Sequence, residues 1–195
     1  MRGYIIVIAG PTGVGETTVT KAVLAKMPRA IRLVTTTSRP KRPGEREGRE
    51  YHFVAKKEFQ RRIRQGYFLE HIYIRNRGVY YGTYRPTIEY ALASGKILIA
   101  NLELKGVRFM RRQYPHTYTI FIAPENIAQI RARKLQQHPT ITIRELSQRL
   151  ANAQAELREA RYYDAVVVNR EGHLLDTVRR VIALIRAYGR RIRNT

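Results

Sequence analysis

The residues with the clearest chemical meaning form a glycine-rich segment close to the start of the chain. Residues 10–18 read GPTGVGETT and match the phosphate-loop pattern G-x-x-x-x-G-K-[ST] at every position except the lysine. The glycines of such a loop allow successive backbone N–H groups to point at phosphate oxygens, and the N-terminus of the following helix adds a partial positive charge. The segment therefore predicts a nucleotide phosphate loop, in which Thr17 is also the expected ligand of Mg²⁺. The expected loop residues are Gly10, Gly13, Val14, Gly15, Thr17 and Thr18.

Glu16 occupies the position of the missing lysine, and this exchange reverses the charge beside the phosphates. The lysine normally contacts the β- and γ-phosphates. Two like charges about 4 Å apart instead repel by about 4 kcal/mol at an effective dielectric of about 20. Glu16 also falls in the first turn of the predicted helix, where the helix dipole favours an anion. Two outcomes stay open: Glu16 folds back into the phosphate site, or it turns to solvent and a nearby basic residue replaces the lysine.

Apolar segments that alternate with amphipathic ones indicate the fold that must position this loop. The run YIIVIA at 4–9 is apolar throughout and ends at Gly10, which is typical of a buried parallel strand. Strands and helices then alternate, so the sequence predicts an α/β fold with a parallel sheet flanked by helices on both faces. The expected strands are 4–9, 51–55, 68–74, 97–102, 118–123 and 165–169, and the expected helices are 17–26, 56–66, 85–94, 105–113, 124–135, 144–161 and 174–188.

One long stretch interrupts this alternation and indicates an insertion. Residues 35–50 are polar, basic and rich in proline and glycine, which predicts a loop, and short strands, turns and the short helix at 56–66 follow before the alternation resumes. We therefore expect a single domain over 1–195. Its core is expected to consist of 1–34 and 91–195, with an inserted lobe at about 35–90.

The composition adds a large excess of positive charge. Thirty-seven Lys and Arg residues against fifteen Asp and Glu residues give a formal net charge of +22. A field of this size attracts polyanions, so we expect a partner such as RNA or the ribosome, although any single basic cluster also fits a solvated helix face. The absence of cysteine excludes disulfides and fits an intracellular protein of the cytoplasm or an organellar matrix. No apolar run approaches about 18 residues, so no transmembrane segment is expected.

Four further segments carry a resemblance to a known family. Residues 35–45 read TTTSRPKRPGE, 48–54 read GREYHFV, 68–70 read FLE and 80–83 read YYGT. Together with the phosphate loop, these segments make the chain similar to the guanylate kinase family over essentially its whole length. The resemblance implies a P-loop NTPase-type fold in which the inserted lobe binds GMP, and a short lid at about 131–145.

The resemblance also implies a role for each matching residue. Arg39 and Arg42 would grip the phosphate of GMP, because guanidinium forks suit an oxyanion. Tyr51 and Tyr81 would donate hydroxyls to the same phosphate, and Glu70 would accept hydrogen bonds from N1 and the exocyclic amine of guanine. The remaining expected substrate contacts are Thr35 and Thr83, near O6 of the base, and Glu103.

Other departures from the family pattern fall on the catalytic half of the site. Asn101 stands where a carboxylate is expected to support Mg²⁺, and a neutral amide is a weaker partner for that ion. In the lid, Gln136 and His138 stand where two arginines are expected, and the glycine hinges are absent. The cations that remain near the lid as phosphate clamps are Arg133, Lys134 and Arg149.

Two functions follow from this combination. We expect first a guanylate-kinase-like protein that keeps a site for GMP or another phospho-ligand but transfers phosphoryl groups weakly or not at all, as a basic scaffold on RNA or a ribonucleoprotein. This function needs no cofactor and leaves ATP binding in doubt. The alternative is an active guanylate kinase that converts ATP and GMP to ADP and GDP with Mg²⁺. It needs another cation in place of the lysine, from among Lys105, Arg133, Lys134 and Arg149. The expected catalytic side chains are Arg39, Arg42, Arg133 and Arg149.

Overall fold

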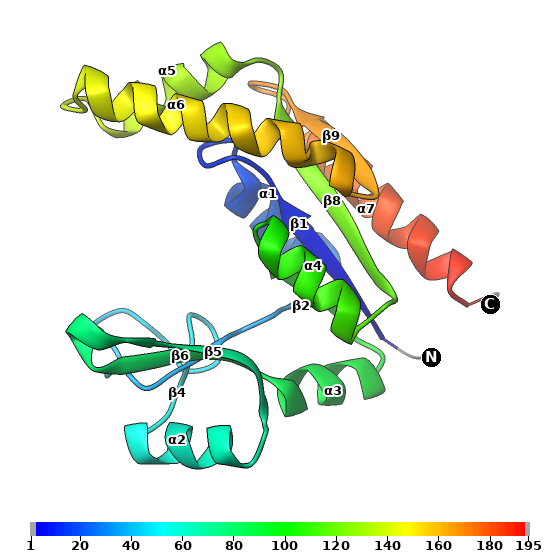
Figure 1. Ribbon diagram of the computed structural model, residues 1–195. Coiled ribbons are helices and arrows are strands. Elements are labelled where there is room, and N and C mark those ends of the chain that lie inside the picture. Colours follow the sequence, from blue (N-terminus) through cyan, green and yellow to red (C-terminus); the bar gives the residue numbers. More distant parts are fainter. Residues whose placement is uncertain (1–2, 194–195) are drawn as a thin grey trace.

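The centre of the molecule is a five-stranded parallel sheet, shown in a computed structural model that describes residues 3–193 (Figure 1). Its strands are β1 (Tyr4–Ala9), β2 (Ala30–Arg32), β7 (Ile97–Asn101), β8 (Thr117–Pro124) and β9 (Ala165–Asn169), in the order β2-β7-β1-β8-β9. β1 lies in the middle and pairs in parallel with β7 and β8, from Tyr4 opposite Ile97 and from Ile5 opposite Thr117. The α/β prediction is confirmed: this is a parallel sheet flanked by helices.

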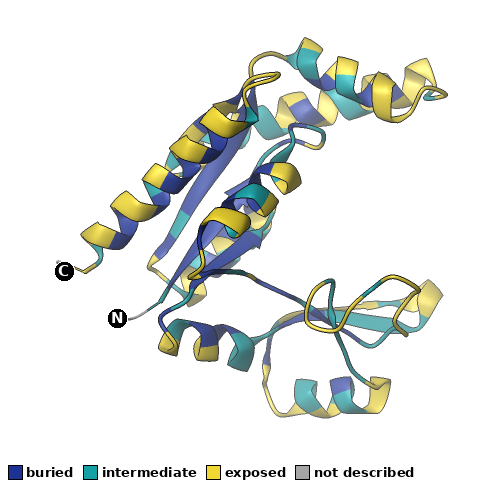
Figure 2. Ribbon diagram, turned by 180° about the vertical axis from the view of Figure 1, so that it is seen from behind, coloured by how far each residue is buried: buried dark blue, intermediate teal, exposed yellow. Residues whose placement is uncertain are grey.

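Both faces of the sheet are covered by helices, which explains why β1 is apolar at every position. Ile6 and Ile8 pack on one face against α1 (Glu16–Lys26) and α7 (Leu174–Arg191). Ile5 and Val7 pack on the other face against α3 (Arg85–Ala93) and α4 (Leu104–Gln113). Figure 2 shows the sheet as the buried centre of the molecule, with α7 buried only on its inner side. A strand enclosed in this way has no face that requires polar residues.

A second, four-stranded sheet forms a separate lobe below the core in Figure 1. It consists of β3 (Thr36–Thr37), β4 (His52–Phe53), β5 (Phe68–Ile74) and β6 (Val79–Tyr84), in the order β4-β3-β6-β5. β5 and β6 form an antiparallel hairpin around the 3-10 turn Arg75–Arg77. The helix α2 (Lys56–Arg64) packs on this sheet through Phe59, whose ring stacks on Phe68.

An arm of two helices projects from the other end of the core. It is formed by α5 (Ile127–Gln137) and α6 (Ile143–Arg158), which lie side by side in Figures 1 and 2. Near its C-terminal end, α6 packs through Leu157 against Ala9 at the end of β1 and Phe121 within β8, and the 3-10 turn Glu159–Tyr162 follows. In Figures 1 and 2, the arm and the small sheet extend to the same side of the parallel sheet.

Several predicted elements differ from the structure. The helix expected at 124–135 begins only at Ile127 and continues to Gln137, because Pro124 ends β8 and the Asn126 side chain caps the helix by accepting a hydrogen bond from the Gln129 N–H. The long helix expected to reach residue 161 gives way to a 3-10 turn at Glu159. The loop expected at 35–50 contains the short strand β3, and the strands β2 and β6 were not predicted. No helix within residues 3–193 is both long and apolar enough to cross a membrane.

Candidate functional site

The glycine-rich segment connects β1 to α1 at the carboxyl edge of the parallel sheet, where open α/β sheets bind their ligands. Gly13 and Gly15 have φ values of +98° and +93°, a region that residues with a side chain rarely adopt. A Cβ atom on Gly15 would also lie 2.9 Å from the Asn169 side chain. Glycine is therefore required at both positions by backbone conformation, and a Cβ atom at either would also crowd a neighbouring side chain.

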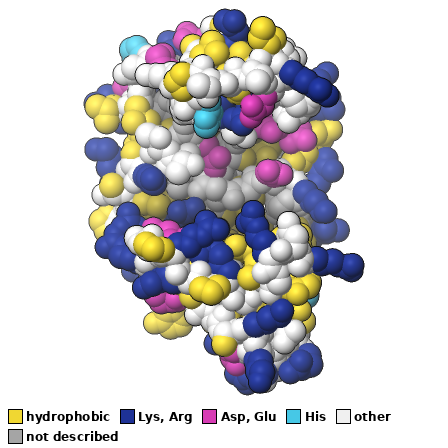
Figure 3. All heavy atoms as spheres, turned by 90° about the vertical axis from the view of Figure 1, so that its left-hand side faces the viewer, with side chains coloured by type: hydrophobic (Ala, Val, Ile, Leu, Met, Phe, Trp, Pro, Cys, Tyr) yellow, Lys and Arg dark blue, Asp and Glu magenta, His cyan; other side chains and the backbone are white. Residues whose placement is uncertain are grey.

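A cavity of about 720 Å³ opens over this loop. In Figure 3 the surface is hollowed between the arm and the small sheet, with carboxylate side chains inside the hollow and basic ones around it. The cavity therefore combines backbone N–H groups with side chains of both charges. Its lining includes the loop glycines, Thr17 and Thr18, the carboxylates Glu16, Glu103, Glu156 and Glu171, and the cations Arg133, Lys134 and Arg170.

Glu16 is partly buried and is held by Asn101. The Asn101 side-chain amide donates hydrogen bonds to the Glu16 carboxylate and, at 2.9 Å, to the Thr20 hydroxyl. Burial raises the pKa of Glu16 to about 7, against the opposing effects of the Asn101 hydrogen bond and of the more distant Arg32. Glu156 adds to this rise by repulsion, and its own pKa is raised by burial. Near neutral pH, Glu16 therefore exists in both the charged and the neutral form.

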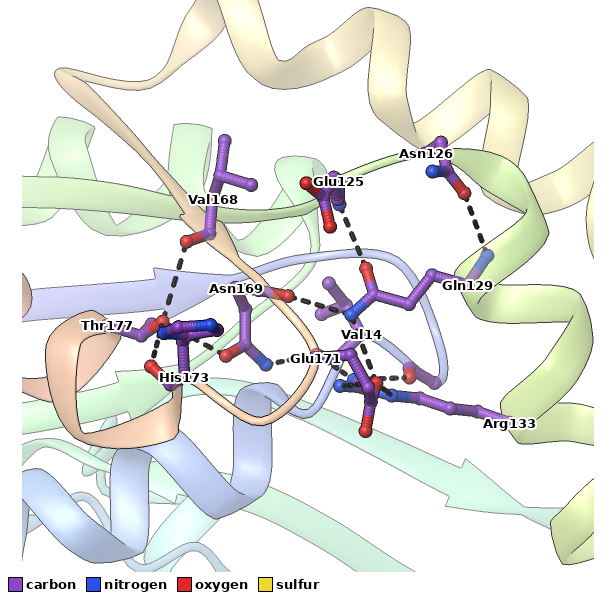
Figure 4. A network of polar contacts seen from close by, with 11 residues as sticks. Val14, Glu125, Asn126, Gln129, Arg133, Val168, Asn169, Glu171, His173 and Thr177 are labelled. Atoms are coloured by element: carbon purple, nitrogen blue, oxygen red, sulfur yellow. Dashed lines mark hydrogen bonds and ion pairs between the residues drawn. The ribbon is translucent and has the colours of Figure 1, made fainter.

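Arg133 lies against the back of the loop (Figure 4). Its guanidinium donates to the carbonyl oxygens of Val14 at 2.7 Å and Gly13 at 3.3 Å, and forms an ion pair with Glu171 at 2.6 Å. Asn169 supports the same loop, because its buried amide donates to the Val14 carbonyl at 2.7 Å and accepts from the Thr177 hydroxyl at 3.1 Å. Both side chains therefore bind loop carbonyls and fix the shape of the loop.

Lys134, the next residue along α5, is placed differently. It is only 4% exposed and lines the cavity above the loop. Burial lowers the pKa of Lys134, and the charge of Arg149 on α6 adds to this effect. Arg149 itself forms an ion pair with Glu145 at 2.5 Å. Of the three expected clamps, Arg133 and Arg149 thus each have a carboxylate partner, whereas Lys134 has none among the described residues.

A second group of expected residues gathers on the small sheet. The Arg39 guanidinium makes a bidentate ion pair with Glu45, at 2.6 and 2.7 Å, and its Nε donates to the Tyr81 hydroxyl at 3.2 Å. Arg39 also lies over the Tyr51 ring, and the Tyr51 and Tyr81 rings meet edge to face with centroids 5.6 Å apart. Hydrogen bonds from Arg39 and from the Arg42 backbone N–H lower the pKa of Glu45 to about 2. Arg39 is thus held in place by an ionised carboxylate.

Glu70 and Thr83 face each other across the hairpin of the same sheet. The buried Thr83 hydroxyl donates to one carboxylate oxygen of the exposed Glu70 at 3.0 Å. Thr35 lies just before β3, where its carbonyl accepts from the His52 N–H, and the Arg42 side chain is exposed. Glu103 lies apart from these residues, at the start of α4, in the wall of the phosphate-loop cavity.

The site residues therefore form two groups, one at the carboxyl edge of the core and one on the small sheet. Four contributors had no role in the sequence analysis: Glu45, Glu156, Glu171 and Asn169. Glu45 ends the family-like segment at 35–45, and its place in that segment was the only available signal. Glu156, whose carboxylate accepts from the Thr12 N–H at 3.3 Å, and Asn169 reach the loop from distant elements, and no local pattern identifies them.

Comparisons with known proteins agree with one another. A family model described as guanylate kinase matches residues 2–188. A guanylate kinase of Symbiobacterium thermophilum is 39% identical over 186 residues, which cover 95% of this chain and 84% of that protein. A guanylate kinase of Thermotoga maritima is 35% identical over 187 residues, covering 96% and 88%. Among solved structures, guanylate kinase from Anaplasma phagocytophilum matches with a TM-score of 0.66 and 27% identity, covering 95% of this chain and 86% of that one.

Proposed function

The chain belongs to the guanylate kinase family, and on this premise we propose that it transfers the γ-phosphoryl group of ATP to GMP. The sequence alone favours an inactive scaffold and leaves this kinase activity as the alternative. The relatives that match over most of their length are named guanylate kinases, which favours the active enzyme. The observation that carries the proposal is the ordered acceptor group on the small sheet, with Arg39 fixed by Glu45 and Tyr81.

The acceptor group suits GMP by its chemistry. The second Glu70 oxygen can accept from N1–H and the exocyclic amine of guanine, since Thr83 engages only the first. Adenine has no N1–H, so it cannot make this pair of bonds. Arg39, Arg42 and the hydroxyls of Tyr51 and Tyr81 supply donors for the phosphate, while Thr35 and Glu103 complete the contacts with the base.

The transfer itself is a displacement at phosphorus. A phosphate oxygen of GMP attacks the γ-phosphorus of ATP, and this new bond forms as the bond from the γ-phosphorus to the β–γ bridging oxygen breaks. The electron pair of the broken bond stays on ADP. If GMP reacts as a dianion, charge is balanced without release of a proton. The chain must therefore position the two nucleotides and stabilise negative charge.

Mg²⁺ fits this site as an ion that arrives with ATP. Residues 3–193 contain no group of three or more His, Asp or Glu side chains placed to hold a metal. The cavity wall nevertheless offers the Thr17 hydroxyl and the carboxylate of Glu103. Mg²⁺ commonly uses one or two carboxylates together with substrate phosphates, and when bound it neutralises phosphate charge. The loop N–H groups and Thr17 would then hold the phosphates in register.

The test is a coupled assay of ADP formation with Mg·ATP and GMP, AMP, CMP or UMP as acceptor. We expect turnover with GMP alone, above about 1 s⁻¹, the low end of ordinary enzymes. Glu70→Ala should lower kcat/KM for GMP about 100-fold, since guanine would lose its paired acceptor. Glu89→Ala, at an exposed position of α3, is the matched control and should leave kcat/KM unchanged. Calorimetric binding of GMP without any ADP formation would instead support the scaffold.

A specific feature of α7 favours a second candidate function, the binding of a polyanion such as RNA. Arg179, Arg186 and Arg190 follow one another at helical spacing on its exposed side, and only Arg179 pairs with an acid on this helix, Asp176. The apolar side of α7 is buried in the core, so it offers nothing to insert into a bilayer. We refer to these three arginines as the basic stripe.

The basic stripe can be tested separately from catalysis. Fluorescence anisotropy with a labelled single-stranded RNA should show binding that weakens steeply with salt. The double exchange Arg186→Gln and Arg190→Gln should reduce both the affinity and the salt dependence, with GMP-dependent ADP formation as the control. Equal RNA affinity of the variant and the unaltered protein would contradict this function.

A further inference from the structure

Lys134 lies directly over the phosphate loop. A Cβ atom built on Gly13 would lie 2.9 Å from Lys134 Cε and 3.3 Å from Nζ. Gly13 thus leaves room for the lysine side chain as well as adopting a left-handed conformation. Lys134 comes from α5 in the arm, far along the chain from the loop that it covers.

Lys134 is also the cavity cation without a partner. Among Lys, Arg, Asp and Glu side chains of residues 3–193, only that of Lys134 is buried. It forms no hydrogen bond or ion pair within this part of the chain, whereas Arg133 and Arg170 pair with Glu171 and Glu125. Glu16 lines the same cavity, yet no ion pair joins it to Lys134.

The side chain of Lys134 is largely buried while its ammonium group has no partner among the described residues of the cavity that it lines, and such a group is unfavourable unless an anion binds to it. Removing a charge from water costs free energy that only a counter-charge or hydrogen bonds recover. Burial, aided by Arg149, accordingly lowers the pKa of Lys134. The ligand that would restore the balance is an anion bound in this cavity, which Gly13, Gly15 and Thr17 of the phosphate loop also line. A nucleotide di- or triphosphate has this chemistry.

We propose that Lys134 binds the terminal phosphates of ATP and supplies, from helix α5, the positive charge that Glu16 removes from the phosphate loop. The inference rests on the proposed function, which requires such a cation. It selects one residue from the four that the sequence offered. Arg133 is bound to loop carbonyls and Glu171, Arg149 is paired with Glu145, and Lys105 is absent from the cavity lining.

The experiment replaces Lys134 by Met, which keeps a similar shape without the charge. We expect kcat for ADP formation to fall about 100-fold and Kd for ATP to rise, as when one stabilising group is removed from a transition state. Kd for GMP, measured calorimetrically, should not change. Lys21→Met, at an exposed position of α1, is the matched control and should resemble the unaltered protein in all three quantities. Lys134→Arg should restore part of the loss.

A second variant separates the lost charge from a structural defect. If Lys134 replaces the loop lysine, then adding Glu16→Lys to Lys134→Met should restore ATP affinity and turnover. Unchanged ATP affinity and kcat in Lys134→Met would overturn the proposal, as would a loss that Glu16→Lys does not relieve.

The readouts also separate this proposal from the proposed function. If the unaltered chain forms no ADP, the kinase function fails, but the ATP titration still decides the role of Lys134. Weaker ATP binding by Lys134→Met would then support the lysine as a phosphate ligand. Equal binding by the two proteins, or no ATP binding by the unaltered chain, would overturn it.

Discussion

Burial of Glu16 beside Asn101 couples the charge of the phosphate loop to pH. With its pKa raised to about 7 by burial, this carboxyl group is neutral in part of the molecules at neutral pH. A neutral carboxylic acid does not repel a phosphate, and an arriving triphosphate favours the neutral form further. Protonation of Glu16 therefore reduces the repulsion between this residue and a phosphate bound at the loop.

Glu16→Gln should stabilise the protein in a pH-dependent way. In the folded protein the pKa of Glu16 is higher than in the unfolded chain, so its contribution is complete below about pH 4.5 and is lost as pH rises through about 7. Glutamine does not titrate. The variant should match the unaltered protein near pH 4.5 and exceed its free energy of unfolding by about 1–3 kcal/mol near pH 8. Urea unfolding at the two pH values measures this, and a difference that does not depend on pH would contradict it.

The phosphate loop could be predicted because all of its information is local. The glycine spacing and the strand–helix junction identify residues 10–18 as a phosphate loop without any information from the rest of the chain. The role of Lys134 could not be predicted in the same way, because four basic residues appeared equivalent. Only burial and the absence of a partner distinguish it, and these depend on how α5 packs over a loop that lies far away in the sequence.

At the scale of elements, the predictions agree with the structure for two apolar strands and for one strand, 68–74, that also contains Glu70 and His71. The predicted strands at 4–9, 68–74 and 165–169 agree with β1, β5 and β9. β3 and β6 were missed because they are polar or aromatic, and their extended form depends on pairing, as between Thr36 and Gly82. Predicted and observed helix boundaries differ where a capping residue sets the first turn, as Asn126 does for α5.

Asn169 joins three elements near the phosphate loop: its side chain makes the contacts with the loop and with α7, whereas α5 binds its backbone carbonyl, which alanine keeps. It ends β9, its amide binds Val14 and Thr177, and its carbonyl accepts from the Gln129 side chain of α5 at 2.9 Å (Figure 4). Asn169→Ala leaves the buried Val14 carbonyl with one donor fewer. We expect a loss of about 1–3 kcal/mol in the free energy of unfolding.

An exposed asparagine provides the control for this prediction. Asn152 lies on the surface of α6 and accepts only from the Gln148 side chain. Asn152→Ala should change the free energy of unfolding by less than about 0.5 kcal/mol. Urea unfolding of both variants makes the comparison, and equal effects would show that the network around Asn169 adds no stability.

At the scale of the whole molecule, the positive charges that give the net charge of +22 repel one another, and this repulsion destabilises the folded state. The acids that pair with arginines, such as Glu58 with Arg61 and Arg62, offset only part of this repulsion. Salt screens exposed charges, since the Debye length falls from about 10 Å at 0.1 M to about 3 Å at 1 M.

Added NaCl should therefore raise the melting temperature, by roughly 2–4 °C for each kcal/mol gained in a protein of this size. Differential scanning calorimetry between 0.05 and about 0.5 M salt tests this. The double exchange Arg186→Glu and Arg190→Glu lowers the net charge of the basic stripe and should reduce the salt effect. A melting temperature that falls with salt would mean that specific ion pairs outweigh the general repulsion.

The pairing of the strands also fixes an order in which the chain becomes organised. β5 and β6 are joined by a short turn. β1 instead pairs with β7 and β8, which are separated from it in the sequence by all four strands of the small sheet. Contacts between residues close in sequence form first, because little entropy is lost in closing a short loop. Amide protons of the β5–β6 hairpin should thus become protected in pulse-labelling exchange before those of β1. The lobe assigned to the acceptor nucleotide would then acquire its shape while the phosphate loop is still disordered.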